Sequence, residues 1–161
     1  MSKGFLSGLL FLMIALVFQV FWSFTFGIRN IRPDFILVTL IFICFQRDSI
    51  FGVLMGFTAG LLTFATTGFG ALGLLFSRLL AGFFAGSLTK SLSKNNDLLI
   101  IISVLWLTPV SGAVMMITNP RPLLLGIEKI LISTLLNVIL AGCILLFKFI
   151  FFKDKKNYYL D

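Results

Sequence analysis

The chain has few of the residues that catalysis and metal binding usually need. Its 161 residues include no histidine, two cysteines and six acidic residues. Histidine is the commonest general base and metal ligand, and Cys44 and Cys143 lack metal-site or redox spacing, which favours buried free thiols. The carboxylates fall at the ends of apolar runs, in polar turns or in the tail, and no nucleophile or phosphate-binding motif occurs. We therefore expect no enzyme activity, no catalytic residues, no metal and no cofactor.

Charged residues are scarce as well. They make up 12 % of the chain, about half of the roughly 25 % typical of a soluble domain. Hydrophobic residues make up 59 % and include 20 phenylalanines. A soluble domain of this size could not bury that much apolar surface. The composition predicts an integral membrane protein in contact with the lipid bilayer.

The basic excess has two interpretations. A net charge of +7 can indicate nucleic-acid binding, but no basic patch interleaved with aromatic residues occurs here. The basic residues are instead scattered over short polar segments and the C-terminal tail. This pattern favours a topology signal and contact with anionic lipids. We expect no nucleic-acid partner.

The apolar runs predict an all-α bundle of about six transmembrane helices. We expect one domain at 1–152, followed by a short basic cytoplasmic tail at 153–161. The second span is short, and the alternative is an interfacial or re-entrant segment. The first run is longer than the apolar core of a signal peptide and is expected to be retained. The expected spans are 5–26, 33–46, 50–66, 69–88, 98–118 and 128–150.

Basic residues are unequally divided between the two sides of this six-span arrangement. The excess marks the cytoplasmic side, so both termini are expected there, and omitting the second span would separate them. Arg78 remains inside the fourth span. The side of the termini carries Lys3, Arg47, Lys90, Lys94, Lys148, Lys153, Lys155 and Lys156, and the opposite side carries Arg29, Arg32, Arg121 and Lys129.

Glycines recur at intervals of four in two of the spans, which lets helix backbones approach closely. One interpretation is packing within this chain. The other is a docking face for the membrane helix of a partner. The residues concerned are Gly52, Gly56 and Gly60 in the third span and Gly82 and Gly86 in the fourth.

Two polar residues lie deep in predicted spans. Arg78 shares a helix stripe with Gly82 and Gly86, and an intramembrane charge is a functional candidate by default. We considered structural cohesion, an anionic-ligand site and snorkelling to the interface for it. Its expected partners are backbone carbonyls, Asn137, Gln19 or a wet pocket. Asn137 is expected to form interhelical hydrogen bonds, which contribute about 0.6 kcal/mol on average.

The run Arg32-Pro33-Asp34 opens an apolar helix. A polar turn with Arg47, a glycine-rich helix, a glycine-rich turn and a second helix ending in 82–86 follow. This order resembles the rod shape-determining protein MreD family, over residues 31–90 by motif and elsewhere by span pattern. Asn137 also matches an asparagine often found in the family's last helix. Phe64 departs from the pattern, because the family commonly has aspartate there, and the glycine turn is one residue longer.

The resemblance implies a compact six-helix bundle similar to the substrate-binding subunits of energy-coupling-factor transporters. It implies a non-enzymatic scaffold of the cell-wall elongation machinery in the bacterial cytoplasmic membrane. The implied partners are an MreC-type bitopic protein, a complex of RodA with a class B penicillin-binding protein and, indirectly, MreB. We expect the glycine faces and Arg78 to hold the helix of the MreC-type partner. The alternative functions are a small-molecule-binding subunit of a transporter and a lipid-handling or structural membrane protein.

Overall fold

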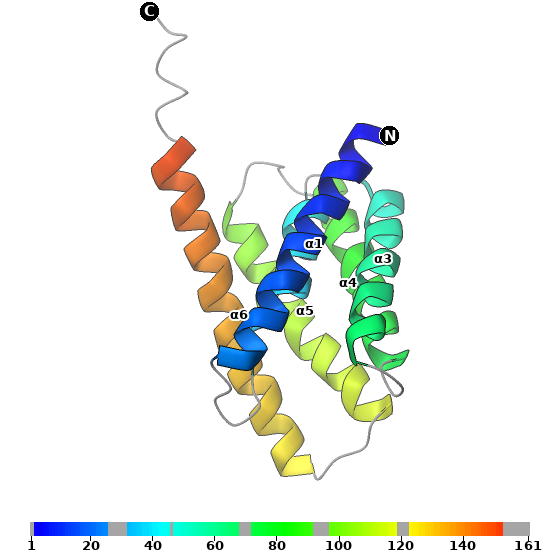
Figure 1. Cartoon of the computed structure of the whole chain (residues 1–161), viewed down its shortest axis with the longest axis vertical. Helices are drawn as coiled ribbons and strands as arrows, with labels where there is room; N and C mark the ends of the chain where they lie inside the picture. Colours follow the sequence, from blue (N-terminus) through cyan, green and yellow to red (C-terminus); the bar gives the residue numbers. More distant parts are fainter. Residues whose placement is uncertain are drawn as a thin grey trace, which may run out of the picture.

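The computed structural model describes residues 2–25, 32–45, 47–67, 72–91, 97–118 and 123–152. These residues form six α-helices and no strand. Figure 1 shows them as a single bundle, with the N-terminus of α1 and the C-terminal end of α6 toward the same end. The helices are α1 (Ser2–Thr25), α2 (Phe35–Cys44), α3 (Ser49–Thr67), α4 (Leu72–Ser91), α5 (Asp97–Thr118) and α6 (Leu123–Phe152).

The all-helical prediction is confirmed, and each predicted span coincides with one helix. Four helices, α1, α3, α5 and α6, are long and apolar enough to cross a membrane. These four indicate a multi-pass membrane protein. α2 and the apolar part of α4, Leu72–Leu88, are shorter. The expected tail at 153–161 and the expected glycine turn at 68–70 lie outside the described residues.

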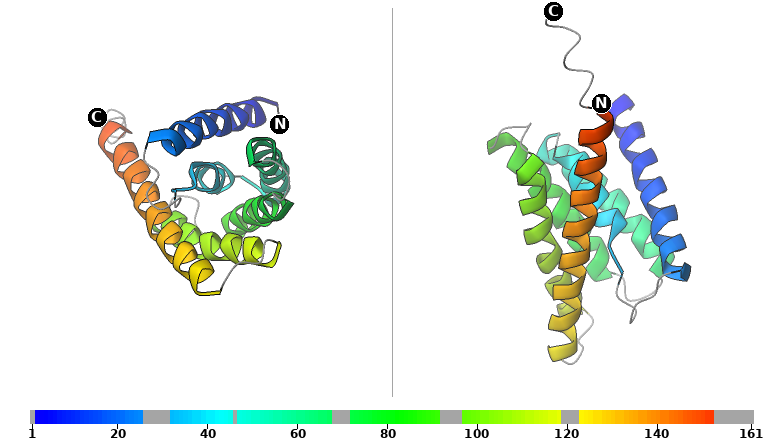
Figure 2. Two further views of the ribbon diagram at one scale, coloured as in Figure 1. Left: turned by 60° about the horizontal axis from the view of Figure 1, so that its bottom comes forward. Right: turned by 90° about the vertical axis from the view of Figure 1, so that its left-hand side faces the viewer.

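The short helix α2 forms the centre of the bundle. Viewed toward one end of the molecule, it lies inside a ring formed by the other helices (Figure 2), and it contacts all five of them. Apart from Thr39, all its side chains are apolar, which is typical of a helix buried all round. Its fully buried residues include Ile36, Val38, Leu40, Ile41 and Cys44.

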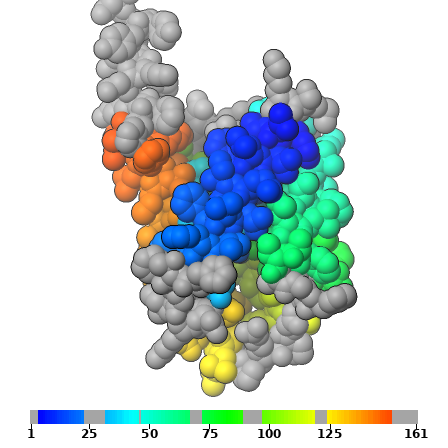
Figure 3. All heavy atoms as spheres, viewed as in Figure 1, coloured from blue at the N-terminus to red at the C-terminus, as the bar shows by residue number. Residues whose placement is uncertain are grey.

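The outer helices are apolar on their exposed faces. Figure 3 shows α1 lying across one side of the bundle, between α6 and α3. Phe11, Phe18 and Phe21 of α1 and Leu131 and Leu135 of α6 are each more than half exposed. A soluble monomer rarely exposes so continuous an apolar surface. The acyl chains of a bilayer solvate such a surface, so these faces are suited to contact with lipid.

Helices α3 and α4 pack backbone to backbone along the glycines named above. A Cβ atom on Gly82 would overlap the carbonyl oxygen of Gly52. A Cβ on Gly56 would lie 2.5 Å from the Arg78 carbonyl oxygen, and one on Gly86 would lie 2.7 Å from that of Asp48. Only glycine permits this approach.

The glycine faces are therefore occupied within the chain. Gly60 completes the seam, because its Cβ would lie 2.9 Å from Leu75 Cα. Packing within the chain, the first interpretation above, is the one that the structure supports. The hypothesis that these faces hold a partner's helix is wrong for this fold, because no room is left between α3 and α4 for a third helix.

Candidate functional site

Residues 32–34, which lead into α2, are not helical. Pro33 is buried there, and the Asp34 carboxylate caps the helix by accepting from the Leu37 N–H at 2.9 Å. Aspartate is among the preferred N-cap residues because its side-chain oxygen satisfies an otherwise unpaired N–H. Asp34 therefore lies at the positive end of the α2 dipole.

Arg78 of α4 forms an ion pair with Asp34. The two residues are 44 positions apart in the sequence. The arginine side chain is 1 % exposed and the aspartate 20 %. Arg78 Nη1 also donates to Ser111 Oγ of α5 at 3.2 Å, and Ser111 Oγ in turn donates to Ser77 Oγ at 3.0 Å. The buried guanidinium thus joins the start of α2 to two surrounding helices.

Asn137 of α6 also binds at the start of α2. Its Oδ1 accepts from the Asp34 backbone N–H at 2.6 Å, and its Nδ2 donates to Thr108 Oγ1 of α5 at 3.3 Å. The asparagine is fully buried. The predicted interhelical hydrogen bonds of Asn137 are confirmed, and one of them reaches a backbone group that sequence alone did not suggest.

Gln19 of α1 completes the arrangement. Its Oε1 accepts from the Ile36 N–H at 3.2 Å. The N–H groups of Asp34, Ile36 and Leu37 are therefore all satisfied by side chains, where a helix would otherwise leave unpaired donors. We call the following residues the polar cluster: Gln19, Asp34, Ser77, Arg78, Thr108, Ser111 and Asn137.

The polar cluster lies at the depth of the middle of the bundle. Asn137 is midway along the apolar stretch Leu124–Ile150 of α6, and the Asp34 N–H lies 2.6 Å from its side chain. α2 has 10 residues and is about 15 Å long, half of the roughly 30 Å of a bilayer core. Non-helical backbone at such depth is tolerated where protein or a water-filled cavity surrounds it.

The carboxylate that pairs with Arg78 was not among its expected partners. Asn137 and Gln19 bind the backbone of α2, whereas the guanidinium binds Asp34 and Ser111. We expected no carboxylate at depth, because Asp34 precedes an apolar run and such positions usually face water. The signal that could have revealed it is length: the apolar core Phe35–Phe45 is too short to reach both membrane surfaces.

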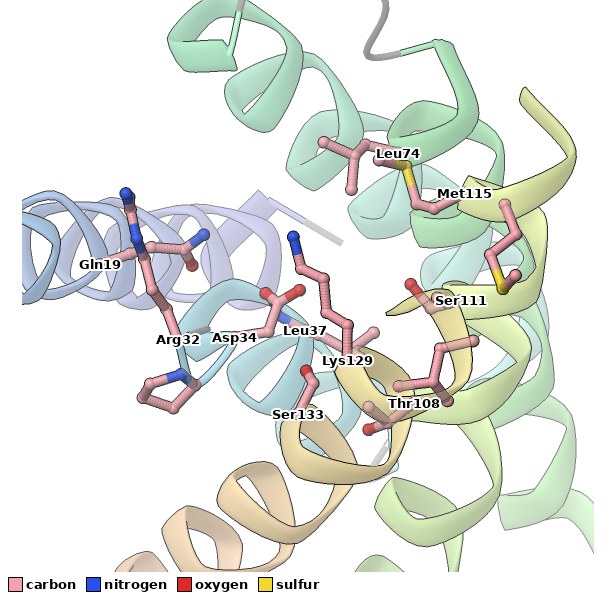
Figure 4. A pocket seen from close by; sticks show the side chains of 15 residues that line it. Gln19, Arg32, Asp34, Leu37, Leu74, Thr108, Ser111, Met115, Lys129 and Ser133 are labelled. Carbon is pink, nitrogen blue, oxygen red and sulfur yellow. The ribbon is translucent and has the colours of Figure 1, made fainter. Parts of the chain in front are cut away.

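A cavity of about 490 Å³ lies beside the polar cluster. Figure 4 shows Gln19, Arg32, Asp34 and Lys129 around it, with Leu74 and Met115 on another side. Lining residues come from near the start of α4, the end of α5 and the start of α6. The wall is formed by Gln19, Arg32, Pro33, Asp34, Leu37, Leu74, Thr108, Ser111, Gly112, Met115, Met116, Gly126, Lys129, Ile130 and Ser133.

The cavity and the polar cluster carry binding groups rather than a recognisable catalytic set. Among the described residues of the cavity wall, Asp34 carries the one carboxylate, and that carboxylate is already paired with Arg78. Within the described ranges, no three His, Cys, Asp or Glu side chains are grouped so that they could hold a metal ion. Phe64, at the family's aspartate position, is half-buried in α3.

Comparison of the chain with protein-family models, curated proteins and solved structures finds no match.

Proposed function

We propose that the protein is a non-enzymatic membrane scaffold of the cell-wall elongation machinery, of the kind that the MreD resemblance implies. The observation that carries this proposal is the meeting of Asp34 and Asn137. Both residues belong to the resemblance, and they are 103 positions apart in the sequence. A chance likeness between apolar sequences gives no reason for its motif residues to touch.

The architecture suits such a role. We infer a six-helix bundle in the bacterial cytoplasmic membrane, with both termini in the cytoplasm, similar in fold to the substrate-binding subunits of energy-coupling-factor transporters. The polar cluster stiffens the centre of the bundle by joining five helices at the start of α2. A rigid body with apolar outer faces is what a scaffold needs to present to membrane partners.

The binding face for an MreC-type partner is now expected on the outer surface. The glycines of α3 and α4 are buried against each other, whereas α1 and α6 expose large apolar side chains along their length. The partner's single membrane helix would displace lipid from one of these faces. Through that partner the protein would reach the RodA–penicillin-binding-protein complex and, indirectly, MreB.

The test is a pull-down of the tagged protein from its native membrane in mild detergent, with identification of co-purified proteins by mass spectrometry. Recovery of an MreC-type protein, with or without the glycan synthase, is the expected result. Recovery of two ATPases and a coupling membrane subunit would contradict it. The control is an unrelated multi-pass protein with the same tag.

The cavity favours a second candidate, a small-molecule-binding subunit of an energy-coupling-factor-type transporter. Its volume of about 490 Å³ falls within the roughly 300–1,000 Å³ of ligand pockets. The same pull-down separates the two candidates, because the transporter subunit would bring its ATPases. Complementation of a rod-shape mutant by the full chain would support the scaffold instead.

A further inference from the structure

Helix α5 carries an exposed stripe of side chains on the side that faces away from the bundle. Its members recur at intervals of three or four positions, so they lie on one face of the helix along its whole length. In the left-hand view of Figure 2, α5 lies on the opposite side of α2 from α1. The stripe is therefore separate from the exposed face of α1. It consists of Leu98, Ile102, Leu105, Trp106, Val110, Ala113 and Ile117.

Trp106 differs from the other members of the stripe because it is an amphipathic side chain at great depth. The residue is 70 % exposed and lies near the middle of the 22 residues of α5. At 1.5 Å per residue it is about 13 Å from the nearer end of the helix, which is deep within a bilayer core of roughly 30 Å. Membrane tryptophans usually collect at the interface with water. The indole ring of Trp106 instead faces hydrocarbon.

The indole N–H of Trp106 is a hydrogen-bond donor without a partner. None of the described residues accepts a hydrogen bond from it. Acyl chains offer no acceptor, and an unsatisfied polar group in hydrocarbon is costly. A second molecule that supplies an acceptor at this depth would remove that cost.

The same turn of α5 also contains an acceptor that has lost its helical donor. Pro109 lies inside the helix, and proline has no N–H to donate to the carbonyl four residues earlier. That carbonyl belongs to Leu105, which is 49 % exposed and precedes Trp106 in the stripe. Side-chain hydroxyls or neighbouring helices usually satisfy such a carbonyl in a membrane. Among the described residues, no hydroxyl of α5 does so.

We propose that a second copy of this chain covers the stripe, with the two α5 helices packed against each other across a two-fold axis. Two copies inserted with the same orientation are related by an axis along the membrane normal, so equivalent residues lie at the same depth. The same patch on each copy then faces the other. Each Trp106 N–H donates to the Leu105 carbonyl of the other copy, and both unsatisfied groups acquire partners.

Two other occupants fit the stripe less well. Lipid leaves both the Trp106 N–H and the Leu105 carbonyl unpaired, because acyl chains neither donate nor accept hydrogen bonds. An unrelated helix would have to bring a donor and an acceptor to this depth, whereas a second copy carries both on adjacent residues. Ala113, one turn beyond Pro109, adds little bulk, so two backbones can approach closely here. The inference goes beyond the scaffold function and does not depend on it.

The test measures dimerisation of the full chain in phosphatidylcholine liposomes. Copies that carry a donor or an acceptor fluorophore on a C-terminal tag are mixed, and energy transfer is followed as the protein is diluted in lipid. Trp106→Phe keeps an aromatic ring and removes the N–H. Pro109→Ala restores a helical donor to the Leu105 carbonyl. The control is Phe11→Leu, which changes an exposed aromatic residue on α1.

We expect the parent to dimerise, and Trp106→Phe and Pro109→Ala each to weaken the dimer by about tenfold, because each variant removes both hydrogen bonds. The double variant should be no weaker than either single variant, since the same two bonds are lost. Phe11→Leu should dimerise like the parent. Equal dimerisation by Trp106→Phe and the parent would overturn the proposal. A parent that stays monomeric at every dilution would overturn it in favour of an unrelated helix.

Disulfide cross-linking gives a second measurement that does not depend on the folding of those variants. In a cysteine-free background, Ile102→Cys lies on the stripe one turn before Trp106, and Leu135→Cys lies on the exposed face of α6. Oxidation in liposomes should link two copies through Ile102→Cys and not through Leu135→Cys. Equal cross-linking at the two positions would show random collision and contradict the proposed interface.

Discussion

Replacing Arg78 by methionine removes a buried charge and leaves Asp34 without its counterion. Breaking a buried ion pair by removing one partner destabilises by about 3–5 kcal/mol. Asp34 is 20 % exposed and borders the cavity, so we expect the lower end of that range for Arg78→Met. Asp34→Asn retains an N-cap side chain but leaves a guanidinium that is 1 % exposed unpaired. For this variant we expect the upper end.

The double variant Arg78→Met/Asp34→Asn measures the effect of removing both charges of the ion pair together. With both charges removed, neither residue is left ionised in the interior, and such replacements are often close to neutral. The remaining loss is the hydrogen bond from Arg78 to Ser111, so we expect about 1–2 kcal/mol. The double variant should therefore be more stable than either single variant.

An exposed ion pair in the same chain provides the control for these variants, and a buried cysteine provides the reporter of unfolding. Lys148 and Asp97 form an ion pair at 2.6 Å with both side chains 51 % exposed, so Lys148→Met should cost less than about 1 kcal/mol.

Cys44 is buried and Cys143 is exposed. In a Cys143→Ser background, a thiol-reactive fluorophore should label Cys44 only as the bundle opens. Titration with SDS in mixed micelles then gives the free energy of unfolding.

Two results would refute this reasoning. If Arg78→Met costs no more than Lys148→Met, the buried ion pair does not hold the start of α2. If the double variant loses the sum of the two single losses, the residues act independently and their contact is incidental. Either result would also remove the main physical reason for calling the polar cluster a structural centre.

Three further predictions follow from other contacts. Gly56→Leu should destabilise the bundle by about 1–3 kcal/mol or more, because its Cβ would lie 2.5 Å from the Arg78 carbonyl oxygen. The control is Gly142→Leu, whose Cβ would have nothing within 4 Å. This control should unfold like the parent in the Cys44 assay. Asn137→Leu should cost about 1–3 kcal/mol, the penalty for an unsatisfied buried donor, because the Asp34 N–H loses its acceptor; equal stability of Asn137→Leu and parent in SDS titration would argue against this role. In a cysteine-free background, Lys129→Cys should react with a membrane-impermeant maleimide added outside intact cells and Lys3→Cys only after permeabilisation; the reverse pattern would invert the proposed topology.

Much of the helical architecture was predictable from the sequence. Apolar runs of membrane-spanning length and the breaks between them placed all six helices near their observed bounds. The depth of Arg78 followed from its place in the fourth run, and Asn137 was correctly expected to bond between helices. These features depend on local composition, which a single sequence displays directly.

The arrangement around α2 was harder to predict because it depends on tertiary contacts. The sequence around Asp34 is typical of a residue at a membrane surface. Only the shortness of α2 indicates that Asp34 lies inside the bundle. The pairing of glycines on α3 with those on α4 depends on an antiparallel register that spacing alone cannot choose. A wet pocket was among the surroundings considered for Arg78, but the wall of the cavity could not be predicted, because it combines residues from five of the helices and from the segment before α2.

The shortness of α2 also bears on how the protein is made. During synthesis, Asp34 reaches the membrane well before Arg78, because 44 residues separate them. A helix of 10 residues is half the roughly 20 needed to span a bilayer unaided. Its final position therefore has to wait for α4 to arrive with the counterion. We expect a ribosome halted after α3 to leave this segment outside its final place, because Arg78 has not yet been made.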